Sequence, residues 1–77
     1  MEELALVVLT HEIPEYGLLQ GDLVTIVHGY MDGQAWEVEF VTAEGRTVAV
    51  LTLTRADIRP MGSHEILHVR ELSQTAV

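Results

Sequence analysis

Apolar and acidic residues alternate in the middle of the sequence, and this alternation constrains the fold more than any other feature. The alternating residues are Trp36, Val38 and Phe40, with Glu37 and Glu39 between them. Successive side chains of a strand point to opposite faces, so a period of two indicates a strand with one face in a core and one in water. We therefore predict a strand over 35–41, with Trp36 in the core and both glutamates facing solvent.

Turn signals on both sides of this strand predict an antiparallel meander. Asp32-Gly33 precedes the strand and Glu44-Gly45 follows it, and glycine tolerates the positive φ that tight turns require. The adjoining segments 23–30 and 46–54 are rich in β-branched residues, as strands are. One face of the first segment should hold Val24, Ile26, His28 and Tyr30. A lone histidine on such a face is expected to be a hydrogen-bonded structural residue.

The rest of the first sixty residues adds two strands, a loop and a turn. Segment 4–9 is apolar on both faces and reads as a covered strand, and 10–21 reads as a long loop. Thr54-Arg55-Ala56-Asp57 has the spacing of a capping box, which predicts one helical turn, and 58–59 would then form a short strand. This order of elements is the pattern of a small five-stranded SH3-like barrel, an all-β fold.

A separate tail follows the predicted barrel domain. We place the domain at 1–60 and the tail at 61–77. Ser63 can cap a helix over 64–72. A short strand is the alternative, because the apolar residues of this segment fit neither period.

Composition limits the classes of function. The chain has 77 residues and no cysteine, with 12 acidic residues against 4 basic ones and a formal charge of −8. We expect one cytoplasmic domain without disulfides or cofactors, and no membrane span, since the longest apolar run is far shorter than the roughly 20 residues that a span needs. The charge repels nucleic acid and favours a basic protein partner, although it can also serve solubility alone.

Six short motifs occur in a fixed order within residues 4–60. They are Ile13-Pro14-Glu15-Tyr16-Gly17-Leu18, Gly21-Asp22, Tyr30, Trp36-Glu37-Val38-Glu39-Phe40, Gly45-Arg46-Thr47 and Leu51-Thr52-Leu53. In this order they resemble the small bacterial proteins of the domain of unknown function 4926 family. The resemblance implies a compact SH3-like barrel with no assigned activity. Members are often paired with a neighbouring gene, which implies an antitoxin or immunity-like role.

One motif has the spacing of a zinc peptidase. His64-Glu65-Ile66-Leu67-His68 matches His-Glu-x-x-His, in which two histidines one helical turn apart hold the metal and the glutamate activates water. A catalytic site needs a third protein ligand, and the candidates lie upstream at His11 or His28. The alternatives are adventitious metal binding by His64 and His68, or an exposed helix face without a ligand.

No other catalytic arrangement is supported by the sequence. Glu37 and Glu39 would lie about 7 Å apart along a strand, near the separation in inverting glycoside hydrolases. Alternation places them on a solvent face without a pocket, however. The only serines, at positions 63 and 73, lie in the tail and outside a nucleophile elbow. We therefore expect a protein that is not an enzyme.

The remaining hypothesis is a non-enzymatic acidic module that binds a basic protein partner. Tyrosines beside an acidic loop can grip a peptide, and the glutamates of the central strand add negative charge. The candidate partner-binding residues are Glu12, Glu15, Tyr16, Tyr30, Glu37 and Glu39. A structural homo-oligomer is the alternative, because 48% apolar residues exceed what so small a core hides; a homodimer would join through strand edges or the tail.

Overall fold

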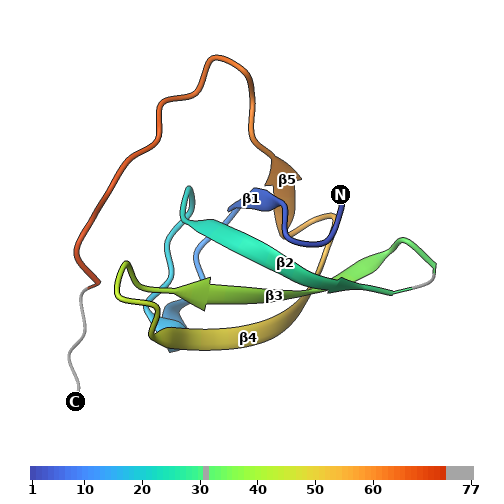
Figure 1. The fold of residues 1–77 in the computed structure, drawn as a ribbon, viewed down its shortest axis with the longest axis horizontal. Helices are drawn as coiled ribbons and strands as arrows, with labels where there is room; N and C mark the ends of the chain where they lie inside the picture. The colour runs from blue at the N-terminus through green and yellow to red at the C-terminus, as the bar shows by residue number, and fades with distance from the viewer. Residues whose placement is uncertain (31, 73–77) are drawn as a thin grey trace.

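The computed structural model describes residues 1–30 and 32–72, and its regular structure is almost entirely β (Figure 1). The elements are β1 (Leu6–Leu9), a short 3-10 helix η1 (Pro14–Tyr16), β2 (Leu23–Gly29), β3 (Ala35–Val41), β4 (Thr47–Thr54) and β5 (Ile58–Pro60). Among these residues, no helix has the length and apolar character to cross a membrane. The predicted all-β class is confirmed.

The strands form one antiparallel sheet in the order β4-β3-β2-β1-β5. β2, β3 and β4 are the predicted meander, and their two hairpin turns place Gly33 and Gly45 at positive φ, 68° and 87°. β1 pairs with both β2 and β5, so the last strand returns beside the first. This order is compatible with the SH3-like barrel that the sequence suggested.

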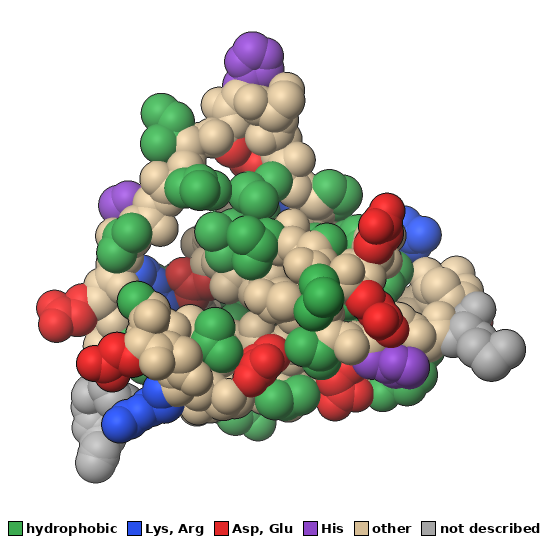
Figure 2. All heavy atoms as spheres, viewed as in Figure 1, with side chains coloured by type: hydrophobic (Ala, Val, Ile, Leu, Met, Phe, Trp, Pro, Cys, Tyr) green, Lys and Arg blue, Asp and Glu red, His purple; other side chains and the backbone are tan. Residues whose placement is uncertain are grey.

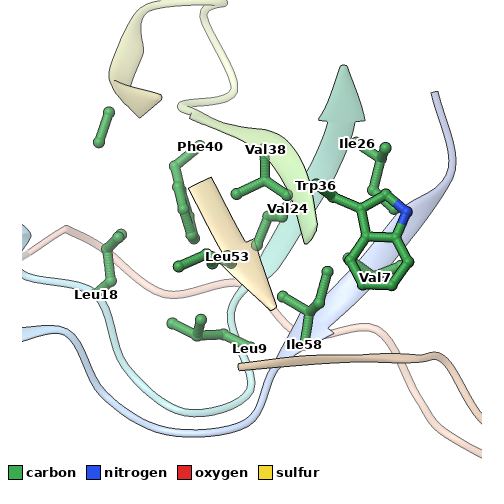
Figure 3. Close-up of a cluster of buried hydrophobic side chains, with 11 residues drawn as sticks. Val7, Leu9, Leu18, Val24, Ile26, Trp36, Val38, Phe40, Leu53 and Ile58 are labelled. Carbon is green, nitrogen blue, oxygen red and sulfur yellow. The ribbon is translucent and has the colours of Figure 1, made fainter. Parts of the chain in front are cut away.

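The hydrophobic core lies on the inner face of the sheet (Figure 3). Trp36, Val38 and Phe40 of β3 are all buried, as their alternation predicted. They pack with Ile26 of β2 and Leu9 of β1, both fully buried. The buried side chains of the described residues are all hydrophobic, so packing without buried polar networks holds the domain together.

A β-bulge in β2 corrects the prediction for His28 and Tyr30, both of which were expected on the face of Val24 and Ile26. Ile26 pairs with Val38, but the next pair along is His28 with Glu37, so Val27 and His28 together oppose one residue. The extra residue reverses the alternation from that point. His28 therefore leaves the core face, its side chain is 57% exposed, and its Nδ1 lies 3.7 Å from Glu3 Oε2.

The turn between β4 and β5 contains one of the two predicted capping contacts. Asp57 Oδ2 accepts a hydrogen bond from the Thr54 backbone N–H at 2.8 Å. Thr54 Oγ1 in turn accepts from the N–H of Ala56 at 3.3 Å, one residue earlier than in a capping box. The helix η1 lies inside the segment predicted as a loop. Gly17 caps its C-terminal end, with φ 70°, and donates its N–H to the Pro14 carbonyl.

The described part of the tail, 61–72, contains neither the helix nor the strand that the sequence left open. It runs away from the sheet and returns to it (Figure 1). Glu65 bonds back to Arg59 and to the N–H of Gly62, while Ile66 and Val69 are 91% and 89% exposed. With no apolar stripe to pack on the barrel, an isolated short helix has little to stabilise it. Residues 73–77 of the predicted tail lie outside the described residues.

Candidate functional site

The outer face of the sheet combines apolar, acidic and hydroxyl side chains. We define the outer face as Leu6, Thr25, His28, Tyr30, Glu37, Glu39, Val50 and Thr52. Pairing aligns Leu6, Thr25, Glu39 and Val50 in one row across four strands, and His28, Glu37 and Thr52 in another. Leu6 and Val50 are 46% and 49% exposed. Figure 2 shows acidic and hydrophobic side chains next to one another on one side of the molecule.

Tyr30 and Glu37 form a defined polar contact at one end of the outer face. The Tyr30 hydroxyl donates a hydrogen bond to Glu37 Oε1 at 2.7 Å. This bond raises the pKa of Tyr30 above its ordinary value. The His28 ring meets Tyr30 edge to face, with 5.0 Å between ring centroids. The bulge in β2 is what brings His28 to this side, so the aromatic pair depends on it.

Glu39 lies in the middle of the outer face, between Thr25 and Val50. Its Oε2 accepts a hydrogen bond from the Thr47 hydroxyl at 2.6 Å. A carboxylate held in place beside exposed aliphatic side chains can meet a cation while its neighbours contact an apolar surface. Such a mixture of apolar contact and fixed charge is typical of protein interfaces.

Three arginine side chains, those of Arg55, Arg59 and Arg70, make contacts away from the two glutamates of the outer face. Arg59 binds Glu65 and Arg70 binds Asp22, each through a bidentate contact. Arg55, in the β4–β5 turn, places its guanidinium over the ring of Trp36, 5.6 Å from the ring centre. Within residues 1–30 and 32–72 no salt bridge involves Glu37 or Glu39, so the outer face keeps its negative charge there.

The structure separates the six candidate partner-binding residues into two groups. Tyr30, Glu37 and Glu39 come together on the outer face. Glu12, Glu15 and Tyr16 lie in the 10–21 loop before β2, whereas Tyr30 directly follows the last residue of that strand. The loop residues are exposed in and around η1, and none of them belongs to the strand rows of the outer face.

The histidines of the zinc motif are not arranged as that motif requires. His64 and His68 lie in the exposed, non-helical tail, and Glu65 is held by Arg59. His11, one proposed third ligand, binds Asp57 instead at 2.7 Å. Within 1–30 and 32–72, no three histidine, aspartate or glutamate side chains gather in a way that could hold a metal ion.

Sequence reasoning missed the contact between Asp22 and Arg70. Arg70 Nε donates to Asp22 Oδ1 at 2.9 Å and Arg70 Nη2 to Asp22 Oδ2 at 2.6 Å. The pair joins the start of β2 to the tail across 48 positions. Neither residue lies in a periodic pattern that points to the other, so the sequence offers no signal for it.

These observations define a small all-β domain with an acidic outer face. The family model described as "Domain of unknown function (DUF4926)" matches residues 3–60. The chain belongs to this family. The match covers all five strands and stops where the tail begins. No curated protein and no solved structure matches the chain.

Proposed function

We propose that this protein is a non-enzymatic interaction module whose outer face binds a basic protein partner. The observation that carries the proposal is the row across the sheet in which Glu39 lies between Thr25 and Val50, with exposed Leu6 at its end. One face of an antiparallel sheet faces solvent when no other layer covers it. Here that face offers both apolar area and fixed negative charge.

The charge of the whole chain supports the same kind of partner. A formal charge of −8 on 77 residues attracts a basic surface and speeds its encounter with the acidic one. A basic gene product encoded nearby would meet this requirement. The protein would then act as the acidic member of a pair, in the manner of an antitoxin or immunity protein.

Paired charge reversals test whether the outer face is the binding surface. The first variant is Glu37→Lys with Glu39→Lys. The matched control, Glu12→Lys with Glu15→Lys, changes net charge by the same amount in the 10–21 loop. Tagged wild type and both variants are used to capture proteins from the native host, and mass spectrometry identifies them. Circular dichroism confirms that each variant folds.

We expect wild type and the loop variant to capture the same basic protein, encoded beside this gene, and the outer-face variant to lose it. If both variants capture it equally, the outer face is not the binding surface. If both lose it equally, net charge rather than this face governs the association. Binding should also weaken at high salt, because exposed charges are screened within about 8 Å at physiological ionic strength.

A further inference from the structure

Asp22 forms a pre-organised site for a guanidinium group. Its Oδ2 accepts the N–H of Leu19 at 2.8 Å, its own N–H donates to the Leu19 carbonyl, and its carbonyl accepts from the N–H of Leu9. All of these contacts lie within the barrel, so the carboxylate is oriented without help from the tail. Burial alone would raise the pKa of Asp22, but the hydrogen bonds from Arg70 and Leu19 lower it overall.

Gly17 supplies a third acceptor to the same site. Its carbonyl accepts a hydrogen bond from Arg70 Nη2 at 3.0 Å, beside the two bonds to Asp22. The side chains of Arg70 and Asp22 are 25% and 19% exposed. Parallel N–H donors on a planar fork fit this set of oxygens, whereas a lysine ammonium presents only a point charge. The geometry of the site therefore suits a guanidinium group better than an ammonium group.

A groove beside this site stays largely unfilled. Its volume is about 830 Å³, and it lies between the barrel and the tail. Leu18, Leu19, Phe40 and Val48 line it on the barrel side, and Val69, Arg70 and Leu72 line it on the tail side. Leu72 reaches the edge near Gly17, but Ile66 and Val69 of the same tail remain almost fully exposed. The tail thus supplies the arginine and one wall of the groove, and the space between that wall and the barrel is open.

The barrel and the tail differ in their relation to the family. Asp22, Gly17 and the barrel-side wall of the groove lie inside residues 3–60, which the family model matches, and Arg70 lies outside them. The site therefore lies inside the residues that the family model matches, and its occupant lies outside them. Two partly exposed ion pairs hold that segment, Arg59–Glu65 and Arg70–Asp22. Such pairs contribute little stability, so a competing ligand can displace Arg70 from Asp22.

We propose that Asp22, Gly17 and the adjoining groove form a receptor site for an arginine-bearing, apolar segment of a partner protein, which the chain's own tail occupies when no partner is bound. The partner segment would place its arginine against Asp22 and fill the groove that the tail leaves open. The negative charge of the chain favours such a ligand. The site uses no residue of the outer face, so it is a second contact surface for the proposed module.

Calorimetry with a synthetic peptide tests this proposal. The probe is the chain's own segment 66–72, Ile-Leu-His-Val-Arg-Glu-Leu, and the receptor is the full chain. Arg70→Ala removes the internal competitor, so this variant should bind the peptide about three- to fivefold more tightly than wild type does. Replacing the peptide's arginine with lysine should abolish most of the binding, and this arm requires no change to the protein.

Asp22→Asn in the Arg70→Ala background should also abolish binding. Asp32→Asn in the same background is the matched control, because Asp32 likewise accepts a backbone N–H in a turn, that of Gln34 at 2.9 Å, and lies far from the groove. Glu37→Lys with Glu39→Lys should leave peptide binding unchanged, which separates this site from the outer face. Circular dichroism reports the folding of every variant.

Three results would overturn the proposal. In the first, the Arg70→Ala variant binds the peptide no more tightly than wild type. In the second, the lysine peptide binds as well as the arginine peptide. In the third, light scattering shows a wild-type dimer that Arg70→Ala dissociates, in which case the occupant is the tail of a second copy of this chain.

Discussion

The imidazole of His11 bridges two segments that lie 46 positions apart, because its Nε2 lies 2.7 Å from Asp57 Oδ1. Its Nδ1 lies 3.0 Å from the carbonyl oxygen of Glu12. Both partners are acceptors, and only the protonated ring donates from both nitrogens. The hydrogen bond to Asp57, then that to Glu12, raises the pKa of His11 above 6.5. The contact therefore fastens the 10–21 loop to the β4–β5 turn in the imidazolium form.

This pair predicts a loss of stability as pH rises. The pKa of His11 is raised in the folded state. The contribution of the His11–Asp57 contact to the unfolding free energy is therefore complete below pH 6.5, the ordinary pKa, and disappears as pH rises through the raised pKa. We compare urea unfolding of wild type and His11→Gln at about pH 5.5 and about pH 8.5. The gap in unfolding free energy should be larger at the lower pH. His64→Gln, in the exposed tail, is the control, and an equal gap at both pH values would contradict the assignment.

Two leucines of β1 should differ sharply in their contribution to stability. Leu9 is fully buried, whereas Leu6 is 46% exposed on the outer face. Leu9→Ala should cost about 2–5 kcal/mol of unfolding free energy, because it removes apolar contacts and leaves a cavity. Leu6→Ala should cost no more than about 0.5 kcal/mol. Chemical denaturation of the two variants measures both, and similar losses would mean that the inner and outer faces have been assigned incorrectly.

The turn between β3 and β4 should depend on glycine at position 45. Gly45 has φ 87°, and no atom lies near the place a Cβ would occupy, so an added side chain meets backbone strain rather than a clash. Gly45→Ala should lower the unfolding free energy by about 1 kcal/mol. Gly45→Asn should cost less, since asparagine visits this conformation more readily. If the two variants are equally stable, the turn does not hold this φ in solution.

The sequence predicted most of the sheet, because hydrophobic alternation and glycine turns are local signals. Trp36, Val38 and Phe40 were assigned to the core correctly from their period of two. The same rule failed at His28, since a bulge of one residue reverses every later side chain and leaves no mark in composition. The Asp22–Arg70 contact was beyond prediction because side-chain pairs between distant loops follow no period. Of the candidate site, Tyr30, Glu37 and Glu39 came together, whereas the loop residues did not.

Glu65 should titrate at an unusually low pH, because its carboxylate is already fully bonded. Arg59 Nη1 and Nη2 donate to its two oxygens at 3.0 and 2.6 Å, and the N–H of Gly62 donates to Oε1. These contacts lower the pKa of Glu65 from 4.5 to about 2. Because this pKa is lowered, the Arg59–Glu65 pair contributes fully to tail attachment above pH 4.5, the ordinary pKa of Glu65. That contribution is lost as pH falls through about 2.

NMR titration of the Glu65 carboxyl carbon measures this value directly. In wild type we expect a midpoint near 2, and in Arg59→Ala we expect the midpoint to move up toward the ordinary value, because the main cause of the shift is gone. Arg55→Ala, which removes an arginine that contacts Trp36 rather than Glu65, should leave the midpoint where it is. A wild-type midpoint near the ordinary value would show that the tail is not tied to Arg59 in solution. The return of the tail to Asp22 would then rest on Arg70 alone.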